Sequence, residues 1–232
     1  MTKTIFNPTK KNLSEIKEWL EKEYQETGEG FLVNWDVIED AFEKNRLIAC
    51  LEDNQPIGFL VYKILDEVSV IVIAEIHPSR RKDGLGRKLV EDSLKYFERK
   101  GAMVTQLNCS PASTERVWKK LGFLNYPKFH SENRRTGLYK ILVDSLPFDL
   151  ETSPVKETIE VWNPLNYNDS ESKWSWNIDF KDNSRILTKP IVFPADYNWR
   201  MKWSKGKDIY FDDEIHRFDK IDFSSFLIIE KL

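Results

Sequence analysis

Two glycines in a basic segment are the residues of this sequence best suited to chemistry. Gly84 and Gly86 lie between an apolar run that ends near His77 and a helical pattern that begins near Leu85. The first N–H groups of a helix lack intrahelical partners and carry positive partial charge, and glycines let the backbone approach a ligand closely. The segment also holds five cations, Arg80, Arg81, Lys82, Arg87 and Lys88. It therefore predicts a cradle for a phosphate or pyrophosphate, the alternative being a tight turn with a solvated basic fringe.

The elements before this loop must position it. Apolar residues recur at helical spacing after Asn12 and again after Asn34, which predicts two amphipathic helices. A meander of three strands is predicted next, with residues 52–56 as the loop between the first two strands. The three strands are Leu47 to Leu51, Ile57 to Lys63 and Val68 to Ile76.

The elements after the loop alternate between helix and strand. A helix is predicted from Leu85 to near Lys100, where Gly101 can take the left-handed cap, and a strand follows from Met103 to Asn108. Ser110 and Pro111 fit the cap and the first position of a further helix that stops at residues 121–123. A strand from Leu138 to Val143 closes this part of the chain.

Two motifs resemble those of one enzyme family. The segment from His77 to Gly86 resembles motif A of the GNAT superfamily of N-acetyltransferases, whose signature is Arg or Gln, two residues, Gly, one residue, and Gly or Ala. Val117 to Phe123 is similar to the end of the family's motif B, and the order of elements matches from about Thr4 to Val143. The resemblance implies an α+β fold, with a GNAT-like mixed sheet flanked by helices and splayed open between its fourth and fifth strands to admit acetyl-CoA.

The resemblance also implies which residues contact acetyl-CoA, the cosubstrate. Ile76 and His77 would offer backbone groups to the pantetheine arm, and the loop from Arg81 to Arg87 would hold the pyrophosphate. Trp118 stands where many members carry a tyrosine that protonates the departing thiolate. The expected cofactor-binding residues are Ile76, His77, Arg81, Lys82, Asp83, Gly84, Leu85, Gly86, Arg87 and Trp118.

The sequence departs from the family at the acid and base positions. The indole of Trp118 can donate a hydrogen bond but is no proton source. Gln106 appears where some relatives carry a glutamate base, and Pro111 replaces a frequent asparagine. The usual general acid and general base of the family are therefore both absent.

An attacking amine with a pKa of about 10.4 is mostly protonated at neutral pH, so a group must remove a proton. Glu75 is the first candidate for the catalytic base, because it lies late in the fourth strand beside the expected split. The alternative is a surface carboxylate paired with a nearby Lys or Arg. Tyr126, His130 and Tyr139 are weaker candidates near the last strands, and Cys109 is interpreted as a packing residue. Direct attack of the amine on acetyl-CoA in a ternary complex is therefore the expected mechanism.

The pattern changes after about Asp144. Leu146-Pro147 and Ser153-Pro154 break the chain, which predicts domains at 1–145 and 157–232 with a linker at 146–156. Period-two alternation from Trp174 to Phe180 and from Trp199 to Trp203 predicts a small antiparallel β domain rich in aromatic residues. Its tryptophans fill a small core or, alternatively, form a surface for recognition or for a homodimer contact.

Composition restricts the other possibilities. Residues 1–150 hold 23 basic and 23 acidic side chains, which argues against a nucleic-acid partner. No signal peptide or membrane-spanning run is present in the sequence, so a cytoplasmic protein without a membrane partner is expected. Cys50 and Cys109 have no metal or redox spacing and are expected to be reduced core residues. The carboxylates from Asp212 to Glu214 near His216 are interpreted as solvated, and no metal is expected.

Three functions fit these observations. The leading hypothesis is an acyl-CoA-dependent N-acetyltransferase that acts on an unidentified primary amine. The second is an inactive or weakly active acyl-CoA-binding protein, which the changes at Trp118 and Gln106 permit. The third is an interaction protein that acts through its C-terminal β domain.

Overall fold

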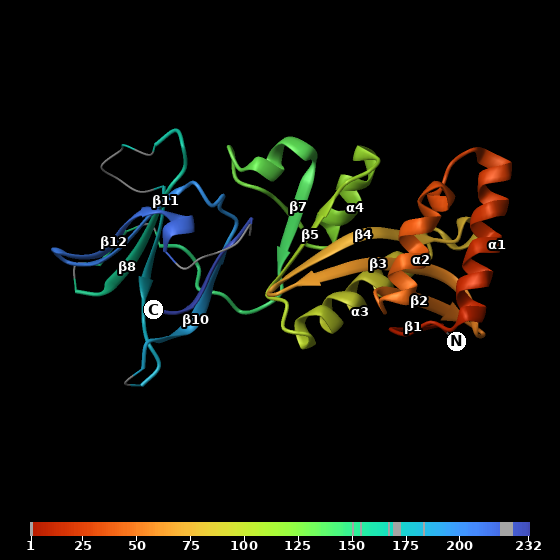
Figure 1. Ribbon diagram of the computed structural model, residues 1–232, viewed down its shortest axis with the longest axis horizontal. Helices are drawn as coiled ribbons and strands as arrows, with labels where there is room; N and C mark the ends of the chain where they lie inside the picture. The colour runs from red at the N-terminus through yellow and green to blue at the C-terminus, as the bar shows by residue number, and fades with distance from the viewer. Residues whose placement is uncertain are drawn as a thin grey trace. The chain divides into compact units, whose positions relative to one another are not determined.

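The computed structural model describes residues 2–149, 151–153, 155–166, 168, 173–182, 184–218 and 225–232. The chain folds into two compact units (Figure 1). The first unit contains Met1–Asn108 and Lys120–Gly122, and the second contains Cys109–Lys119 and Phe123–Leu232. The domain ranges 1–145, 146–156 and 157–232 stay a prediction, and Pro154 of the predicted linker lies outside the described residues. None of the described helices is long and apolar enough to cross a membrane.

The first unit is built on a mixed sheet with the strand order β1-β2-β3-β4-β5. Neighbouring strands are antiparallel except for β4 and β5, which are parallel. The strands are β1 (Thr2–Ile5), β2 (Leu47–Glu52), β3 (Gln55–Leu65), β4 (Val68–Ile76) and β5 (Val104–Asn108). The predicted α+β class and the predicted three-strand meander are confirmed.

The turn between β2 and β3 is shorter than the predicted loop over residues 52–56. Glu52 pairs with Gln55, so only Asp53 and Asn54 lie in the turn, with φ angles of 50° and 68°. Asp and Asn tolerate this left-handed conformation better than most residues. Gln55 and Pro56, which the prediction places in the loop, are therefore part of β3.

Helices cover both faces of this sheet. Phe59 of β3 makes an edge contact with Trp19 of α1 (Lys10–Thr27), at 5.9 Å between ring centroids. Its neighbour Gly58 points to the opposite face, where a Cβ would lie 3.6 Å from Leu89 of α3 (Leu85–Arg99). Helix α2 (Trp35–Glu43) packs beside α1 in the same apolar cluster.

Helix α1 begins earlier than predicted. Thr9 is the N-cap, and the side chain of Asn12 accepts a hydrogen bond from the backbone N–H of Thr9 at 3.0 Å. This is a capping box with Asn at the third position, so Asn12 lies inside the helix rather than before it. The predicted start of α2 after Asn34 is correct.

Strands β4 and β5 separate before they end. Their parallel pairing runs from Val68 and Val104 to Ile71 and Leu107. Strand β4 continues to Ile76, still paired with Gly58 of β3, whereas β5 ends one residue after Leu107. This separation is the one that the family resemblance implied.

The predicted helix after Ser110 starts later than expected. Pro111 caps a short 3-10 turn, η3 (Ala112–Thr114), and the hydroxyl of Thr114 donates to the carbonyl of Pro111 at 2.8 Å. Helix α4 (Glu115–Lys120) follows and ends before Gly122, whose φ is 86°. Pro111 is therefore not the first helical residue, because its ψ of 159° is extended.

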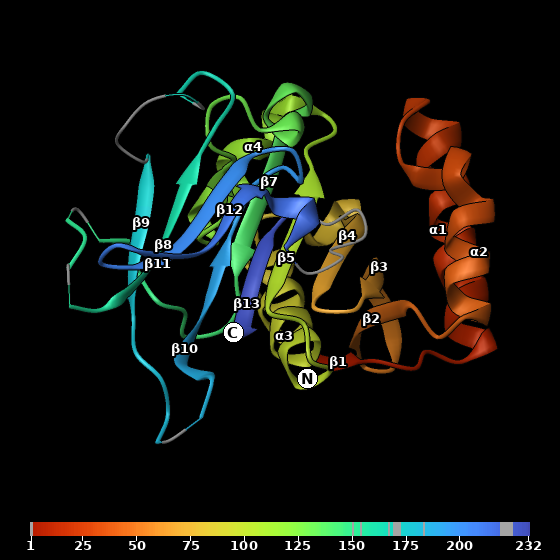
Figure 2. The same cartoon turned by 60° about the vertical axis from the view of Figure 1, so that its left-hand side comes forward.

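The second unit contains antiparallel strands, as predicted (Figure 2). Strand β6 (Leu124–Asn125) pairs with β7 (Gly137–Ile141), and β10 (Ile186–Phe193) pairs with β13 (Leu227–Lys231). A four-stranded sheet has the order β12-β11-β8-β9. Its strands are β8 (Glu157–Trp162), β9 (Trp174–Ile178), β11 (Arg200–Lys205) and β12 (Asp208–Glu214).

The tryptophans of this unit form its core rather than an exposed row. Trp176 and Trp199 are 1% and 0% exposed, and Trp162 is also buried. Trp174 stacks on Trp199 with ring centroids 5.3 Å apart, and Trp203 packs against the same core while partly exposed. The core interpretation of these aromatic residues is confirmed.

Candidate active site

The glycine loop connects β4 to α3 in the first unit. After Ile76 the chain makes the 3-10 turn η2 (Pro78–Arg80) and then reaches Gly84, which precedes α3 and has a φ of 79°. Within the described residues no side chain caps this helix, so its first N–H groups face outward without a capping partner. A Cβ at Gly84 would find open space, whereas a Cβ at Gly86 would meet Ile76 at an ordinary 3.5 Å. Packing alone therefore does not require glycine at position 86.

The cations of the loop are used in different ways. Arg80 donates to both carboxylate oxygens of Glu52, at 3.1 Å from Nη2, and to Asp83 at 3.1 Å from Nε. Arg80 therefore ties the loop to the β2–β3 hairpin. Lys88 is 2.9 Å from Asp92, one turn further along α3.

Two cations remain largely available at the loop. Arg87 is more than half exposed and lies 3.8 Å from Glu91, a loose contact. Lys82, with a φ of 73°, forms no ion pair within the described part of the chain. These two side chains can turn toward a ligand without breaking a close contact.

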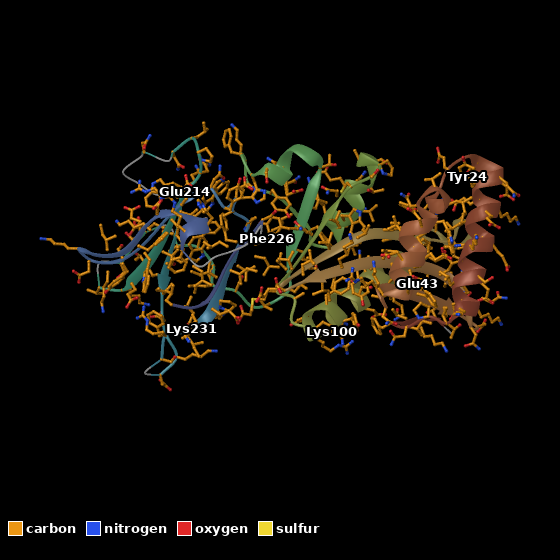
Figure 3. All side chains as sticks on the ribbon, viewed as in Figure 1. Tyr24, Glu43, Lys100, Glu214, Phe226 and Lys231 are labelled. Atoms are coloured by element: carbon orange, nitrogen blue, oxygen red, sulfur yellow. The ribbon has the colours of Figure 1, made fainter. Side chains whose placement is uncertain are left out.

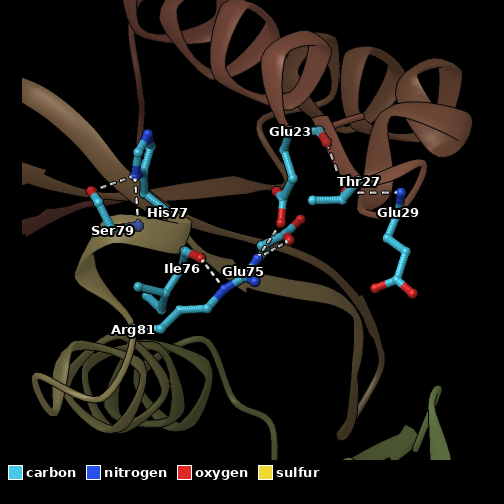
Figure 4. Close-up of polar contacts among 8 residues, drawn as sticks. All are labelled: Glu23, Thr27, Glu29, Glu75, Ile76, His77, Ser79 and Arg81. Carbon is cyan, nitrogen blue, oxygen red and sulfur yellow. Dashed lines mark hydrogen bonds and ion pairs between the residues drawn. The ribbon is translucent and has the colours of Figure 1, made fainter. Parts of the chain in front are cut away.

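Glu75 lies in a buried cluster rather than on the surface. Its side chain is 7% exposed, and Arg81 donates from Nη2 to Glu75 Oε1 at 2.9 Å (Figure 4). The same Nη2 donates to Glu23 Oε1 at 2.6 Å, and Nε of Arg81 donates to the carbonyl of Ile76 at 3.0 Å. Arg81 therefore holds two carboxylates and the end of β4 together.

The pKa of Glu75 is raised from an ordinary 4.5 to about 7. Burial is the largest cause, and the charge of Glu23 raises the pKa further, whereas Arg81 and the N–H of Phe31 lower it. A carboxyl group with a pKa close to neutral can both accept and release a proton at physiological pH.

Glu23 was not singled out in the sequence, although a signal was present. Ile16, Trp19 and Leu20 form the buried stripe of α1, and Glu23 continues this stripe at the next position of the same face. A glutamate on a core stripe needs a partner, because a buried charge without one is costly. Its Oε2 and that of Glu75 are both buried with no hydrogen-bond donor among the described residues.

His77 and Ile76 are already engaged at the end of β4. The N–H of His77 donates to the carbonyl of Ile57 at 2.9 Å, and its ring stacks on Trp19 with centroids 4.8 Å apart. Burial lowers the pKa of His77, and its Nδ1 lies 2.8 Å from the hydroxyl of Ser79. Both rings line a pocket of about 490 Å³ between α1 and the β2–β3 hairpin. The backbone groups that the predicted pantetheine contact would use are thus partly occupied.

Gln106 and Trp118 belong to different units of the structure. Gln106 pairs with Val70 in the β4–β5 ladder of the first unit. Trp118 lies on α4 in the second unit and makes an edge contact with Phe123, at 5.3 Å between centroids.

The weaker candidates Tyr126, His130 and Tyr139 form a buried cluster inside the second unit. The ring of Tyr126 lies 4.4 Å from that of His130 and 5.1 Å from that of Tyr139. His130 is fully buried, with Nε2 3.0 Å from the carbonyl of Ser225. Burial lowers the pKa of His130 and raises the pKa of both tyrosines, so each is held in its neutral form. Phe226, labelled in Figure 3, completes the cluster at 5.8 Å from both tyrosine rings.

The two cysteines are buried, and the carboxylates near His216 lie at the end of β12, where Asp212 and Asp213 form ion pairs. Cys50 and Cys109 are buried and form no disulfide, and burial raises the pKa of both thiols. Asp212 binds Arg200 at 2.7 Å and Asp213 binds Arg217 at 2.8 Å. Across the described ranges, no three His, Cys, Asp or Glu side chains lie together as metal ligands would.

The sheet of the first unit opens at a parallel strand pair beside a glycine loop at a helix N-terminus, as the family resemblance implied. Residues 13–123 match the acetyltransferase (GNAT) family. This part of the chain is therefore a GNAT acetyltransferase domain, and the predicted family and enzyme class are confirmed. No curated protein matches the chain in sequence.

Solved structures share this fold at low sequence identity. A GNAT-family protein of Desulfovibrio desulfuricans superposes with a TM-score of 0.50 and 14% identity, over 62% of this chain and 100% of that one. The PaiA N-acetyltransferase of Thermoplasma acidophilum, in complex with coenzyme A, gives a TM-score of 0.49 and 14% identity over 61% and 99%. A GNAT acetyltransferase of Brucella melitensis, in complex with acetyl-CoA, gives 0.47 and 13% over 63% and 92%.

Proposed function

We propose that this protein transfers an acetyl group from acetyl-CoA to a primary amine by direct attack in a ternary complex. The observation that carries the proposal is Glu75, a buried carboxyl group with a near-neutral pKa at the end of β4. It lies where β4 has parted from β5 and six residues before Arg81 of the glycine loop.

The glycine loop supports the cofactor half of the proposal. The uncapped first turn of α3 offers N–H groups and positive partial charge to a pyrophosphate. Neither packing nor a left-handed φ requires glycine at position 86. The close approach of a ligand explains why this residue is glycine. Lys82 and Arg87 add positive charge, and neither side chain forms a close ion pair within the described residues.

The reaction removes two protons from the ammonium group of the acceptor, one before the attack and one after it. The ammonium group of the acceptor gives a proton to Glu75, and the resulting lone pair attacks the thioester carbonyl carbon. The tetrahedral intermediate then breaks its C–S bond, and the departing thiolate of coenzyme A takes the second proton from the nitrogen, so the products are the neutral amide and the free thiol. A thiol pKa of about 8.5 makes the thiolate an acceptable leaving group without a dedicated acid, which fits tryptophan at position 118.

A non-catalytic acyl-CoA-binding protein is the second candidate, favoured by Trp118 and Gln106 at the usual acid and base positions. Both functions require stabilisation of the fold by acetyl-CoA, measured as a rise in melting temperature. Release of free thiol from acetyl-CoA with a panel of primary amines separates them. We expect Glu75→Gln to lower thiol release by about 100-fold or more while cofactor binding persists.

An intact protein that no acyl-CoA stabilises would contradict both candidates. Binding without thiol release across the panel would favour the non-catalytic one. A cytoplasmic location, the absence of nucleic-acid and membrane partners, and a homodimer stay predictions.

A further inference from the structure

One nitrogen atom of Arg81 serves two buried carboxylates. Nη2 lies 2.6 Å from Glu23 Oε1 and 2.9 Å from Glu75 Oε1, and the side chains of the two glutamates are 6% and 7% exposed. The two N–H bonds of this nitrogen donate to one carboxylate each, and the shorter contact is to Glu23. Charge-assisted hydrogen bonds strengthen as they shorten, so Glu23 holds the guanidinium more strongly than Glu75 does.

We infer that Glu23 is a positioning residue that acts through Glu75, because it holds the Arg81 guanidinium and prevents a one-to-one ion pair between Arg81 and Glu75. This inference rests on the proposed role of Glu75 as the base. A carboxylate paired alone with arginine is a poor base at neutral pH, since the cation favours its ionised form.

The charges of the cluster balance once a proton arrives. Ionised Glu23 and Glu75 with the Arg81 cation carry a net charge of −1, which leaves room for one more positive charge. When the acceptor ammonium gives its proton to Glu75, the acceptor becomes a neutral amine and the cluster becomes neutral. Protonated Glu75 can then donate a hydrogen bond to Glu23, which two ionised carboxylates cannot do.

Groups from three elements face Glu75. Glu23 comes from α1, the N–H of Phe31 from the 3-10 turn η1 (Phe31–Asn34), and Arg81 from the glycine loop. Glu23 raises the pKa of Glu75, whereas Arg81 and the Phe31 N–H lower it. The proton affinity of Glu75 therefore depends on how strongly Arg81 binds Glu75 rather than Glu23.

The chain also makes room for the Glu23 carboxylate. Gly30 has a φ of 95°, and a Cβ there would lie 3.2 Å from Glu23 Oε2, closer than ordinary van der Waals contact. The hydroxyl of Thr27 donates to the backbone carbonyl of Glu23 at 2.7 Å near the end of α1 (Figure 4). The absence of a side chain at Gly30 thus leaves space for the carboxylate, and the Thr27 hydrogen bond caps the backbone of the residue that carries it.

The test is a direct titration of Glu75 in the full chain. Glutamate labelled with ¹³C at Cδ gives one NMR resonance per residue, and the resonance that titrates near pH 7 and disappears in Glu75→Gln belongs to Glu75. We expect Glu23→Gln to lower the midpoint of this resonance by about 1 pH unit or more, because Arg81 then pairs with Glu75 alone. Glu23→Asp, which keeps the charge, should restore part of the shift.

Two further variants keep the result interpretable. Arg81→Gln should move the midpoint upward, which tests the same division of the guanidinium if Glu23→Gln does not fold. Glu29→Gln, an exposed neighbour in the turn after α1, should leave the midpoint unchanged. An unchanged or raised midpoint in folded Glu23→Gln, or a lowered midpoint in Arg81→Gln, would overturn the inference.

Failure of this inference differs from failure of the proposed function. If the Glu75 midpoint ignores Glu23 while acetyl-CoA still stabilises the fold, only the role of Glu23 is wrong. If acetyl-CoA does not bind, the proposed function fails even where the titration behaves as expected.

Discussion

A Cβ atom on Gly58 would lie 2.5 Å from Cδ1 of Ile76 and 3.0 Å from the carbonyl oxygen of Glu75. Glycine at this position of β3 therefore allows the end of β4 to lie as close as it does. Gly58→Ala should displace Ile76 and Glu75 together. We expect lower stability in urea denaturation and slower thiol release, and Gly58→Ala with wild-type turnover would show that the end of β4 need not be held so closely.

The role of Gly84 in cofactor binding can be tested separately from the backbone strain that a side chain would cause at this position. Gly84→Ala forces a Cβ into a φ of 79° at a cost of about 1 kcal/mol, with no steric clash. Gly101→Ala is a matched control, because Gly101 has a φ of 95°, equally open space and a position beyond the other end of α3. Both variants should lose similar stability, but only Gly84→Ala should weaken binding of coenzyme A in calorimetry. Equal affinities in the two variants would argue against a pyrophosphate at this loop.

Lys82 should contribute to cofactor affinity through charge alone. Lys82→Ala removes a cation that has no ion-pair partner in the described residues, so stability should change little. The dissociation constant for coenzyme A should rise roughly fivefold, a loss of about 1 kcal/mol in binding free energy, and the effect should shrink at high salt. Lys95→Ala, at an exposed position of α3 beyond its first turns, should leave the constant unchanged.

Glu75 should make stability depend on pH in a defined window. Its folded pKa of about 7 exceeds the ordinary 4.5, so its contribution is fully present below pH 4.5 and is lost as pH rises through 7. The free energy of unfolding should therefore fall by up to about 3 kcal/mol across this window relative to Glu75→Gln. Urea denaturation at several pH values measures the difference between the two proteins. Parallel curves for the two proteins would show that the Glu75 pKa is not raised.

Phe226 should contribute as much to the stability of the second unit as a residue of its central core does. It is 1% exposed among Tyr126 and Tyr139, so Phe226→Ala should cost about 3 kcal/mol. Phe148→Ala, at a side chain that is 54% exposed, should cost much less. Chemical denaturation of both variants checks this. A small loss in Phe226→Ala would mean that residues 123–141 and the last strand are stable without each other.

Local patterns predicted most of the first unit. The stripe from Leu85 to Phe97 and the glycine at 101 define α3 correctly, and the strands from Leu47 to Ile76 were found because their apolar runs are long. The start of α1 was missed because Asn12 can either cap a helix or complete a capping box three residues inside it. The two-residue turn at Asp53 was missed because Pro56 was interpreted as part of the loop.

Only part of the site could be predicted, because some of its residues are far apart in the sequence. Gly84, Glu75 and Arg81 are close in sequence, and their chemistry could be inferred from the strand and helix around them. Glu23 comes from a helix 52 positions before Glu75, and His130 meets Ser225 across 95 positions. Contacts of this kind depend on how elements pack, which a single sequence does not specify.

The parting of β4 from β5 also has a consequence for hydrogen exchange. Beyond Ile71, no neighbouring strand of the first unit's described residues covers the β5 side of β4. Amides of residues 72–76 that face this side should exchange with solvent faster than those facing β3. On the proposed function, a bound pantetheine arm would supply the missing acceptors and slow that exchange, so the ligand, rather than the chain, would complete this sheet.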